Sequence, residues 1–136
     1  MIPQISQAPG VVQLVLNFLQ VLEQQGFTGD TATSYADRLT MATDNSVYQL
    51  LPDAILFPRS TADVALLARL AAEERFKTLI FTPRGGGTGT NGQALNAGII
   101  VDMSRYMNRI IEINPEEGWV RVEAGVIKDQ LNQFLK

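Results

Sequence analysis

The sequence predicts an α/β (α+β) fold: a small three-stranded parallel sheet with helices, followed by a β-hairpin that begins a second sheet. Short apolar runs at residues 54–57, 78–82 and 98–102 have the length and composition of buried parallel strands. A stretch with helical periodicity separates the first two runs, as in a right-handed strand–helix–strand crossover. Two further runs flank the turn-forming residues 114–118, which is typical of a hairpin.

The first 42 residues are predicted to form an N-terminal helical segment. Within residues 11–25, glutamine and asparagine side chains form one polar stripe on an otherwise apolar helix, and Gly26 ends the pattern. Core packing of the apolar face is the ordinary interpretation, and docking onto a partner is the alternative. Residues 30–41 are expected to form a second helix, capped by Asp30 or Thr31.

Residues 43–136 are predicted to hold the sheet and the functional residues. Residues 44–52 are rich in turn-forming side chains, so we expect a loop there. Ser60, with Asp63 three residues later, marks the start of a helix that we expect to reach about Arg75. This helix would connect the first strand to the second, which makes the two strands parallel.

The C-terminal part is expected to contain a hairpin and one more helix. Strands are predicted over residues 109–113 and 119–123, where charged side chains alternate with valines as in a sheet with one wet face. Gly125 interrupts the pattern, and apolar residues then recur at helical spacing over residues 127–135. The chain stops in this helix without a capping residue, so we expect a domain that is truncated at its C-terminal end.

Composition excludes several classes of function. The chain has 136 residues, 46% of them hydrophobic, which suits one domain with a real core. It has no cysteine and no histidine, which removes disulfides, catalytic Cys–His and Ser–His pairs, and metal sites built on these ligands. No metal ligand is therefore assigned. No catalytic residue is assigned within this chain either. The net charge is −3 and the arginines are scattered, so we expect no nucleic-acid partner.

Targeting signals are absent as well. Residues 1–10 are expected to be irregular, and no positive charge precedes the apolar stretch that begins at Val11. That stretch is too short and too polar to span a bilayer. We therefore expect a cytoplasmic protein without a membrane span in this segment.

The strongest functional signal is a glycine-rich stretch between the second and third predicted strands. Five glycines fall within residues 85–92, directly after Arg84. Glycine lets a ligand approach the main chain and lets neighbouring N–H groups point to one place. Arg84 adds a charged planar fork, and Thr88 and Thr90 add hydroxyl groups. The stretch follows the carboxyl end of a predicted parallel strand, where open α/β sheets bind ligands. It therefore indicates a diphosphate site, with a flexible surface hairpin as the bland alternative.

Two familiar phosphate-binding motifs do not fit this stretch. Residues 87–92 match G-x-G-x-x-G, but too few residues follow for the helix that a dinucleotide-binding crossover requires. The same residues resemble the start of a P-loop, but Gln93 stands where the lysine should be. A nucleotide-hydrolysing enzyme is therefore not supported.

Several motifs together resemble the N-terminal part of the FAD-binding domain of the vanillyl-alcohol oxidase and p-cresol methylhydroxylase (PCMH) type. They are Pro58-x-Ser60-x-x-Asp63-Val64, Pro83-Arg84-Gly85-Gly86-Gly87-Thr88, Gly92-Gln93, Ile100-Val101-Asp102-Met103-Ser104 and Val122-Glu123-Ala124-Gly125-Val126. The resemblance covers roughly residues 37–136. The segment Asp44-x-Ser46-x-Tyr48 before Pro52 is similar to the FAD-linked D-2-hydroxyacid dehydrogenases. These include D-lactate dehydrogenase, the glycolate oxidase flavin subunit and the large iron–sulfur-containing dehydrogenases of the D-2-hydroxyglutarate type.

The resemblance implies that the glycine-rich stretch wraps the FAD diphosphate through backbone N–H groups. The implied cofactor-binding residues are Arg84, Gly85, Gly86, Gly87, Thr88, Gly89, Thr90, Asn91, Gly92, Gln93 and Gly125. Arg84 either contributes charge or braces the loop. Some relatives have a flavin-linked histidine at the position of Thr88, so its absence predicts non-covalent FAD. Gly89 replaces a serine that relatives often carry, which removes one hydroxyl contact.

The resemblance also implies the reaction. The whole protein would oxidise a small-molecule D-2-hydroxyacid, of the D-lactate or D-2-hydroxyglutarate class, with hydride transfer to flavin. Substrate residues would lie beyond Lys136, together with the iron–sulfur cluster that the large relatives carry, so we expect this chain alone to be inactive. The electron acceptor and a homo-oligomeric state remain open. Three alternatives remain: an NADPH-using reductase of a nucleotide-sugar enol ether, a non-catalytic nucleotide-binding module and a protein-interaction module.

Overall fold

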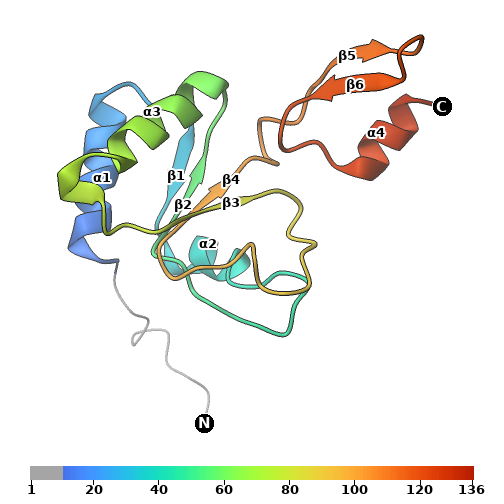
Figure 1. The fold of residues 1–136 in the computed structure, drawn as a ribbon. Helices are drawn as coiled ribbons and strands as arrows, with labels where there is room; N and C mark the ends of the chain where they lie inside the picture. The colour runs from blue at the N-terminus through green and yellow to red at the C-terminus, as the bar shows by residue number, and fades with distance from the viewer. Residues whose placement is uncertain (1–10) are drawn as a thin grey trace.

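A computed structural model describes residues 11–136 as a mixed four-stranded sheet with helices, followed by a separate two-stranded sheet (Figure 1). The strand order in the first sheet is β1-β2-β4-β3. The strands are β1 (Asp30–Ala32), β2 (Ala54–Phe57), β3 (Phe81–Arg84) and β4 (Ile99–Asp102). Strands β2, β4 and β3 are parallel, which confirms the α/β class and the parallel core. The expected irregular lead over residues 1–10 lies outside the described residues.

The antiparallel strand β1 was not predicted. Asp30 pairs with Phe57 and Ala32 with Ile55, so the start of the expected 30–41 helix is an edge strand. Helix α2 (Tyr35–Thr40) begins later, and its N-cap is Ser34, whose hydroxyl accepts from the Asp37 N–H at 3.2 Å. A three-residue strand is too short to carry a period-two pattern. Its conformation is set by pairing with β2, and the prediction of Asp30 or Thr31 as the cap is wrong.

Helix α1 (Gln13–Gln24) and helix α3 (Thr61–Ala71) cover one face of the sheet (Figure 1). Val15, Phe18 and Leu22 of α1 are buried, which confirms core packing of its apolar face. Gly26 follows α1 with φ +90°, a backbone conformation that favours glycine, and ends the helix as predicted.

Helix α3 begins as predicted and ends early. Ser60 is its N-cap and accepts from the Asp63 N–H at 3.3 Å. The helix stops at Ala71 rather than near Arg75, and a 3₁₀ helix (Glu74–Phe76) follows. The early stop lets Phe76 enter the core, where its ring centroid lies 5.1 Å from that of Phe18. The early end of α3 therefore goes together with the burial of Phe76.

Strand β3 begins three residues later than expected, at Phe81 rather than at residue 78, and ends two residues later. Its register is fixed by β4, because Phe81 pairs with Ile99 and Arg84 with Asp102. Pro83 is accommodated because β3 is an edge strand and one side of its backbone needs no partner. The first part of the glycine-rich stretch is therefore anchored in the sheet.

The predicted hairpin is confirmed, with β5 (Ile110–Asn114) and β6 (Trp119–Val122) paired antiparallel. A register shift between Ile110 and Glu112 breaks the alternation that the sequence suggested. Helix α4 (Lys128–Phe134) follows, and the apolar side chains of Phe134 and Leu135 are more than half exposed. The apolar side chains at the end of α4 are therefore little covered by the described part of the chain.

Candidate diphosphate-binding site

The glycine-rich loop leaves the carboxyl end of β3 and takes the place of a crossover helix. Residues 85–98 return from the end of β3 to the start of the neighbouring parallel strand β4 without forming a helix or strand. The loop lies on the side of the sheet that carries α2, away from α1 and α3 (Figure 1). An exposed main chain is thereby held next to the carboxyl ends of parallel strands, where this fold class places its ligands.

The main chain of the loop has unused hydrogen-bond donors. Among the described residues, no acceptor is found for the backbone N–H groups of residues 85–90. Backbone N–H groups are strong donors and are nearly always paired when a protein supplies an acceptor. Neighbouring N–H groups that are left open in a glycine-rich turn are the donors from which proteins build anion-binding sites.

The glycines of the loop fall into two groups. A Cβ added at Gly85 would meet nothing within 4 Å, and one at Gly86 only the Thr88 methyl group at 3.6 Å. These two glycines present open main chain to a ligand. Gly87 and Gly92 instead have φ +65° and +75° and face the protein's own side chains. The second pair fixes the shape of the loop.

Arg84 lies beneath the loop. Its guanidinium donates to the Thr43 carbonyl at 2.8 Å and to the Met41 carbonyl at 3.4 Å. A Cβ on Gly87 would lie 2.5 Å from Arg84 Nη2, so the glycine allows the loop to pass over the guanidinium. Of the two roles expected for Arg84, this placement favours bracing.

The remaining loop residues divide between exposed hydroxyls and internal contacts. Thr88 and Thr90 are exposed. The Gln93 side chain accepts from the Asn91 N–H at 3.0 Å and lies over Gly89, whose added Cβ would be 2.5 Å from Gln93 Cδ. Gln93 therefore shapes the loop from inside, whereas the threonine hydroxyls are free to meet a ligand.

Residues 41–50 form a floor under the loop, which we call the floor segment. The Asn45 N–H donates to the Gly87 carbonyl at 3.0 Å. The Tyr48 ring lies against Gly92, where an added Cβ would be 3.0 Å away. Tyr48 and Leu50, together with Asn91 and Gly92 of the loop, line a hollow of about 350 Å³. From its residue types alone, this segment was predicted only to be a loop. The similarity of its motif to the FAD-linked dehydrogenases was the one sequence feature that indicated a functional role.

Asn96 was also missed, although it anchors the end of the loop. Its side chain is buried, donates to the Thr82 hydroxyl at 2.6 Å and the Ile99 carbonyl at 3.2 Å, and accepts from the Gly98 N–H. The amide therefore joins β3 to the start of β4. No periodicity marks such a residue, because its partners are defined only by strand pairing.

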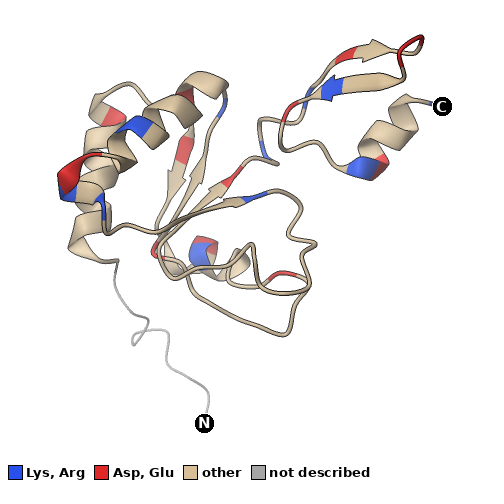
Figure 2. Ribbon diagram, viewed as in Figure 1, with Lys and Arg blue, Asp and Glu red and all other residues tan. Residues whose placement is uncertain are grey.

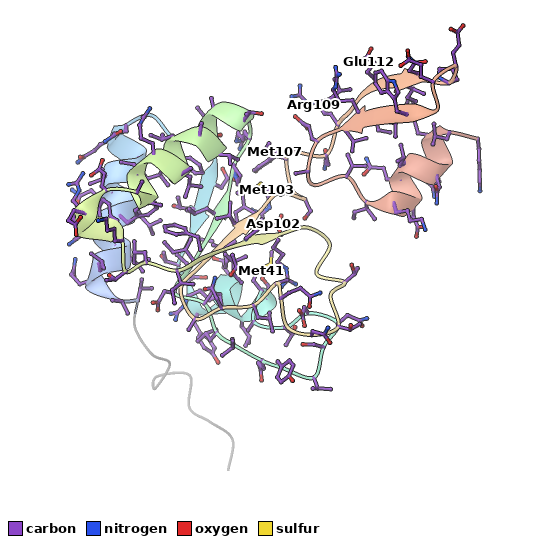
Figure 3. The ribbon with its side chains drawn as sticks, in the orientation of Figure 1. Met41, Asp102, Met103, Met107, Arg109 and Glu112 are labelled. Atoms are coloured by element: carbon purple, nitrogen blue, oxygen red, sulfur yellow. The ribbon has the colours of Figure 1, made fainter. Side chains whose placement is uncertain are left out.

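Gly125 lies apart from the loop. Its N–H donates to the Met107 carbonyl at 2.8 Å, and an added Cβ would collide with the Met103 carbonyl oxygen. Figure 3 labels both methionines, between the end of β4 and the C-terminal hairpin. The glycine is thus needed for close main-chain packing, and its contact with a cofactor stays a prediction.

The loop itself is uncharged. Residues 85–98 contain no acidic or basic side chain, as Figure 2 shows along this stretch. Arg84 precedes it, and Asp44 of the floor segment lies nearby. The pKa of Asp44 is lowered, chiefly by hydrogen bonding from Ser46, with smaller contributions from the Ala94 N–H and the Arg84 charge. Asp44 is therefore ionised near neutral pH.

A second cluster of charged side chains lies at the opposite edge of the sheet, at β1, and its role is to hold elements of the fold together. Asp30 accepts from the Tyr106 hydroxyl and from Arg59 at 3.1 Å, and Arg59 stacks on the Tyr106 ring at 4.0 Å. The hydrogen bond from Tyr106, followed by the bond from Arg59, lowers the pKa of Asp30. These contacts fasten edge strand β1 to the residues that follow β2 and β4.

Residues 11–136 give no support for a membrane-spanning segment or a metal site. No helix there combines the length and hydropathy that crossing a membrane would require. The same residues hold no cluster of three or more potential metal ligands of the histidine, cysteine or carboxylate kind. What the geometry does offer is a main-chain site for an anion at the end of a parallel sheet.

Comparison with known proteins agrees with this geometry. A family model described as FAD binding domain matches residues 52–136. The chain is 90% identical over its whole length to a D-2-hydroxyglutarate dehydrogenase of Escherichia coli (strain K12), of which it spans 13%. It is 30% identical over 96% of its length to a probable mitochondrial D-lactate dehydrogenase of Danio rerio, of which it spans 25%.

A solved structure shares the fold. An alkyldihydroxyacetonephosphate synthase superposes on 98% of the chain with a TM-score of 0.78, at 21% sequence identity, over 27% of that protein. At this identity the similarity concerns the fold alone. It shows that the sheet, the glycine-rich loop and the hairpin form an arrangement found in a larger protein.

Proposed function

The chain belongs to the FAD-binding domain family, and we propose that it supplies the diphosphate-binding part of the flavin site in a D-2-hydroxyacid dehydrogenase. It spans only 13% of the E. coli relative named above, so the activity belongs to a larger protein. D-2-hydroxyglutarate is the substrate that the relative's name indicates. The observation that carries the proposal is the row of unpaired N–H groups at residues 85–90.

The described residues fit FAD at three points. Open space at Gly85 and Gly86 lets a diphosphate reach the main chain. The unpaired N–H groups supply donors, and the exposed Thr88 and Thr90 hydroxyls add two more. A diphosphate needs many donors and little else, so a loop without bulky side chains suits it.

FAD, when bound, supplies the hydride acceptor for oxidation of the hydroxyacid. The residues of this chain bind and orient the cofactor and take no part in proton transfer. Threonine at position 88 cannot form a histidyl–flavin bond, which supports non-covalent binding. An iron–sulfur cluster in the remainder of the protein, homo-oligomerisation and a cytoplasmic location remain predictions.

The proposal is tested by Gly86→Asp in a protein extended through the whole FAD-binding domain. The substitution has space in the folded chain, and it places a carboxylate where the diphosphate would lie. We expect it to weaken FAD binding by at least about 100-fold, through like-charge repulsion and a blocked main chain. Calorimetry and flavin fluorescence measure the affinity.

A matched control introduces the same negative charge at a position away from the loop. Ala65 is exposed on α3, so Ala65→Asp adds the same carboxylate on the opposite side of the sheet. Its FAD affinity should equal that of the wild type. Equal affinities for Gly86→Asp and the wild type would refute the assignment of the loop, and a folded extended protein that ignores FAD would refute the family function.

A further inference from the structure

The hollow beside the glycine-rich loop is not used by the diphosphate site described above. Two segments line it, with Tyr48, Gln49 and Leu50 coming from the floor segment and Asn91, Gly92 and Leu95 from the loop. Its volume of about 350 Å³ lies at the lower end of the range for ligand pockets, which runs from about 300 to 1,000 Å³. The hollow therefore suits part of a dinucleotide, such as one ring system, rather than the whole molecule.

Tyr48 presents to this hollow an aromatic ring that is held in place and yet open. Its N–H donates to the Ser46 hydroxyl at 3.2 Å, and its ring lies against Gly92, where an added Cβ would be 3.0 Å from Tyr48 Cδ2. The residue is nevertheless 58% exposed. An aromatic ring that is positioned by the main chain around it, but not covered, is a stacking surface for a planar ligand.

Apolar and amide side chains complete the hollow. Leu95 is buried and Leu50 is partly exposed, so the lining has an apolar portion. Gln49 and Asn91 are exposed, and each amide offers both a donor and an acceptor. Nucleotide rings are recognised by this combination, with an aromatic surface for the ring face and polar groups for the ring edge. The lining therefore fits a planar nitrogen heterocycle better than a sugar or an aliphatic chain.

We propose that this hollow holds one of the two ring systems of FAD, stacked on Tyr48, while the diphosphate lies on residues 85–90. The inference rests on the FAD site proposed above and extends it from the diphosphate to a ring. Continuity of the loop supports this occupant, because Asn91 and Gly92 directly follow the open main chain of residues 85–90. Adenine and isoalloxazine are both planar heterocycles joined to the diphosphate, so they share the chemistry that the hollow recognises.

Substitutions at Tyr48 test the stacking surface. Removing an aromatic ring that stacks on a base weakens binding by roughly 5- to 150-fold. We therefore expect Tyr48→Ala to raise the Kd for FAD by at least about fivefold, and Tyr48→Phe to change it by less than about twofold. Tyr48→Leu keeps an apolar side chain against Gly92 but has no aromatic face, and it serves if Tyr48→Ala does not fold.

Ligands that carry one ring each show which ring lies on Tyr48. ADP has the adenine and the diphosphate, whereas FMN has the isoalloxazine and one phosphate. If adenine occupies the hollow, Tyr48→Ala weakens FAD and ADP by the same factor and leaves FMN unchanged. If isoalloxazine occupies it, the variant weakens FAD and FMN and leaves ADP unchanged. Calorimetric titration of the full-length apoprotein with each ligand measures the three affinities.

Tyr35 provides a matched control. It is an exposed tyrosine of α2 that does not line the hollow. Tyr35→Ala therefore removes the same side chain at another exposed position of the chain. The affinities of this variant for FAD, ADP and FMN should equal those of the wild type.

The inference fails if the wild type binds FAD and Tyr48→Ala binds it equally well. Equal affinity combined with lower stability would mean that the Tyr48 ring packs against the remainder of the protein instead. The inference also fails if Tyr48→Ala weakens all three ligands by one common factor, because the ring would then act only through the shape of the loop. A wild-type protein that does not bind FAD would overturn the proposed function and this inference together.

Discussion

Asp63 holds the N-terminus of α3 to the chain between α1 and β1, and its removal should be costly. The carboxylate is 3% exposed. It accepts from the Thr28 N–H, the Thr28 hydroxyl and the Arg59 N–H, each at 2.8 Å. Asp63→Ala removes the acceptor for all three donors at once. It also leaves a small cavity at the start of the helix.

The size of the loss follows from those bonds. A hydrogen bond to a charged group contributes about 1.5–3 kcal/mol, but the three bonds share one carboxylate and are not additive. Thr28 and Arg59 are exposed residues, so water can partly replace the lost acceptor. We expect Asp63→Ala to lower the free energy of unfolding by about 3–4 kcal/mol at pH 7, and Asp63→Asn by about half as much.

The loss should depend on pH in a defined direction. Burial alone raises the pKa of Asp63, but the hydrogen bonds from Thr28, Arg59 and Ser60 together outweigh it and hold the pKa below its ordinary value. The carboxylate therefore stabilises the fold above its unfolded pKa of about 3.9, and this stability is lost as the pH falls through the lower folded value. The difference between wild type and Asp63→Ala should shrink progressively below about pH 4.

Urea unfolding followed by circular dichroism at several pH values measures these differences. The slope against urea should stay constant, which shows that both proteins unfold from equally compact states. Glu116→Gln, an exposed change of the same charge, should stay within about 0.5 kcal/mol of the wild type. A loss below about 1 kcal/mol at pH 7, or one that persists unchanged to acid pH, would refute the role given to Asp63.

Three further substitutions test the loop and the core. Gly87→Ala forces a side chain into a backbone with φ +65° and toward a guanidinium 2.5 Å away, so we expect a loss of about 1–3 kcal/mol in thermal or urea unfolding and weaker FAD binding. Gly85→Ala has open space and should change stability by less than about 0.5 kcal/mol, so equal losses at the two positions would contradict the division of the glycines. Phe18→Ala removes a fully buried ring whose centroid lies 5.1 Å from Phe76 and 5.2 Å from Phe81. It should cost about 3–5 kcal/mol in urea unfolding, and a loss under about 1.5 kcal/mol would show that α1 is not part of the core.

Features that depend on neighbouring residues could be read from the sequence. The polar stripe of α1 and its stop at Gly26 are local patterns, and both are confirmed. The apolar run 54–57 is buried along its whole length, as expected for a strand covered on both faces. The glycine-rich stretch was identified by composition, because no other residue type leaves the main chain so accessible to a ligand.

Features that depend on distant residues needed the tertiary structure. Strand β1 forms only because Asp30–Ala32 pairs with β2, and no three-residue pattern predicts such pairing. The first residue of β3 is set by its register with β4. Asn96 likewise became visible as an anchor only when β3 and β4 lay side by side.

The sequence by itself determined that a glycine-rich loop follows a parallel strand and can meet a diphosphate. Only the tertiary structure decided how that loop is built. It showed that Gly85 and Gly86 face open space and that Arg84 lies beneath the loop. The reason is physical: glycine permits many backbone conformations, and local sequence cannot choose among them. The choice is made by contacts with the floor segment, which lies about 40 residues earlier in the chain.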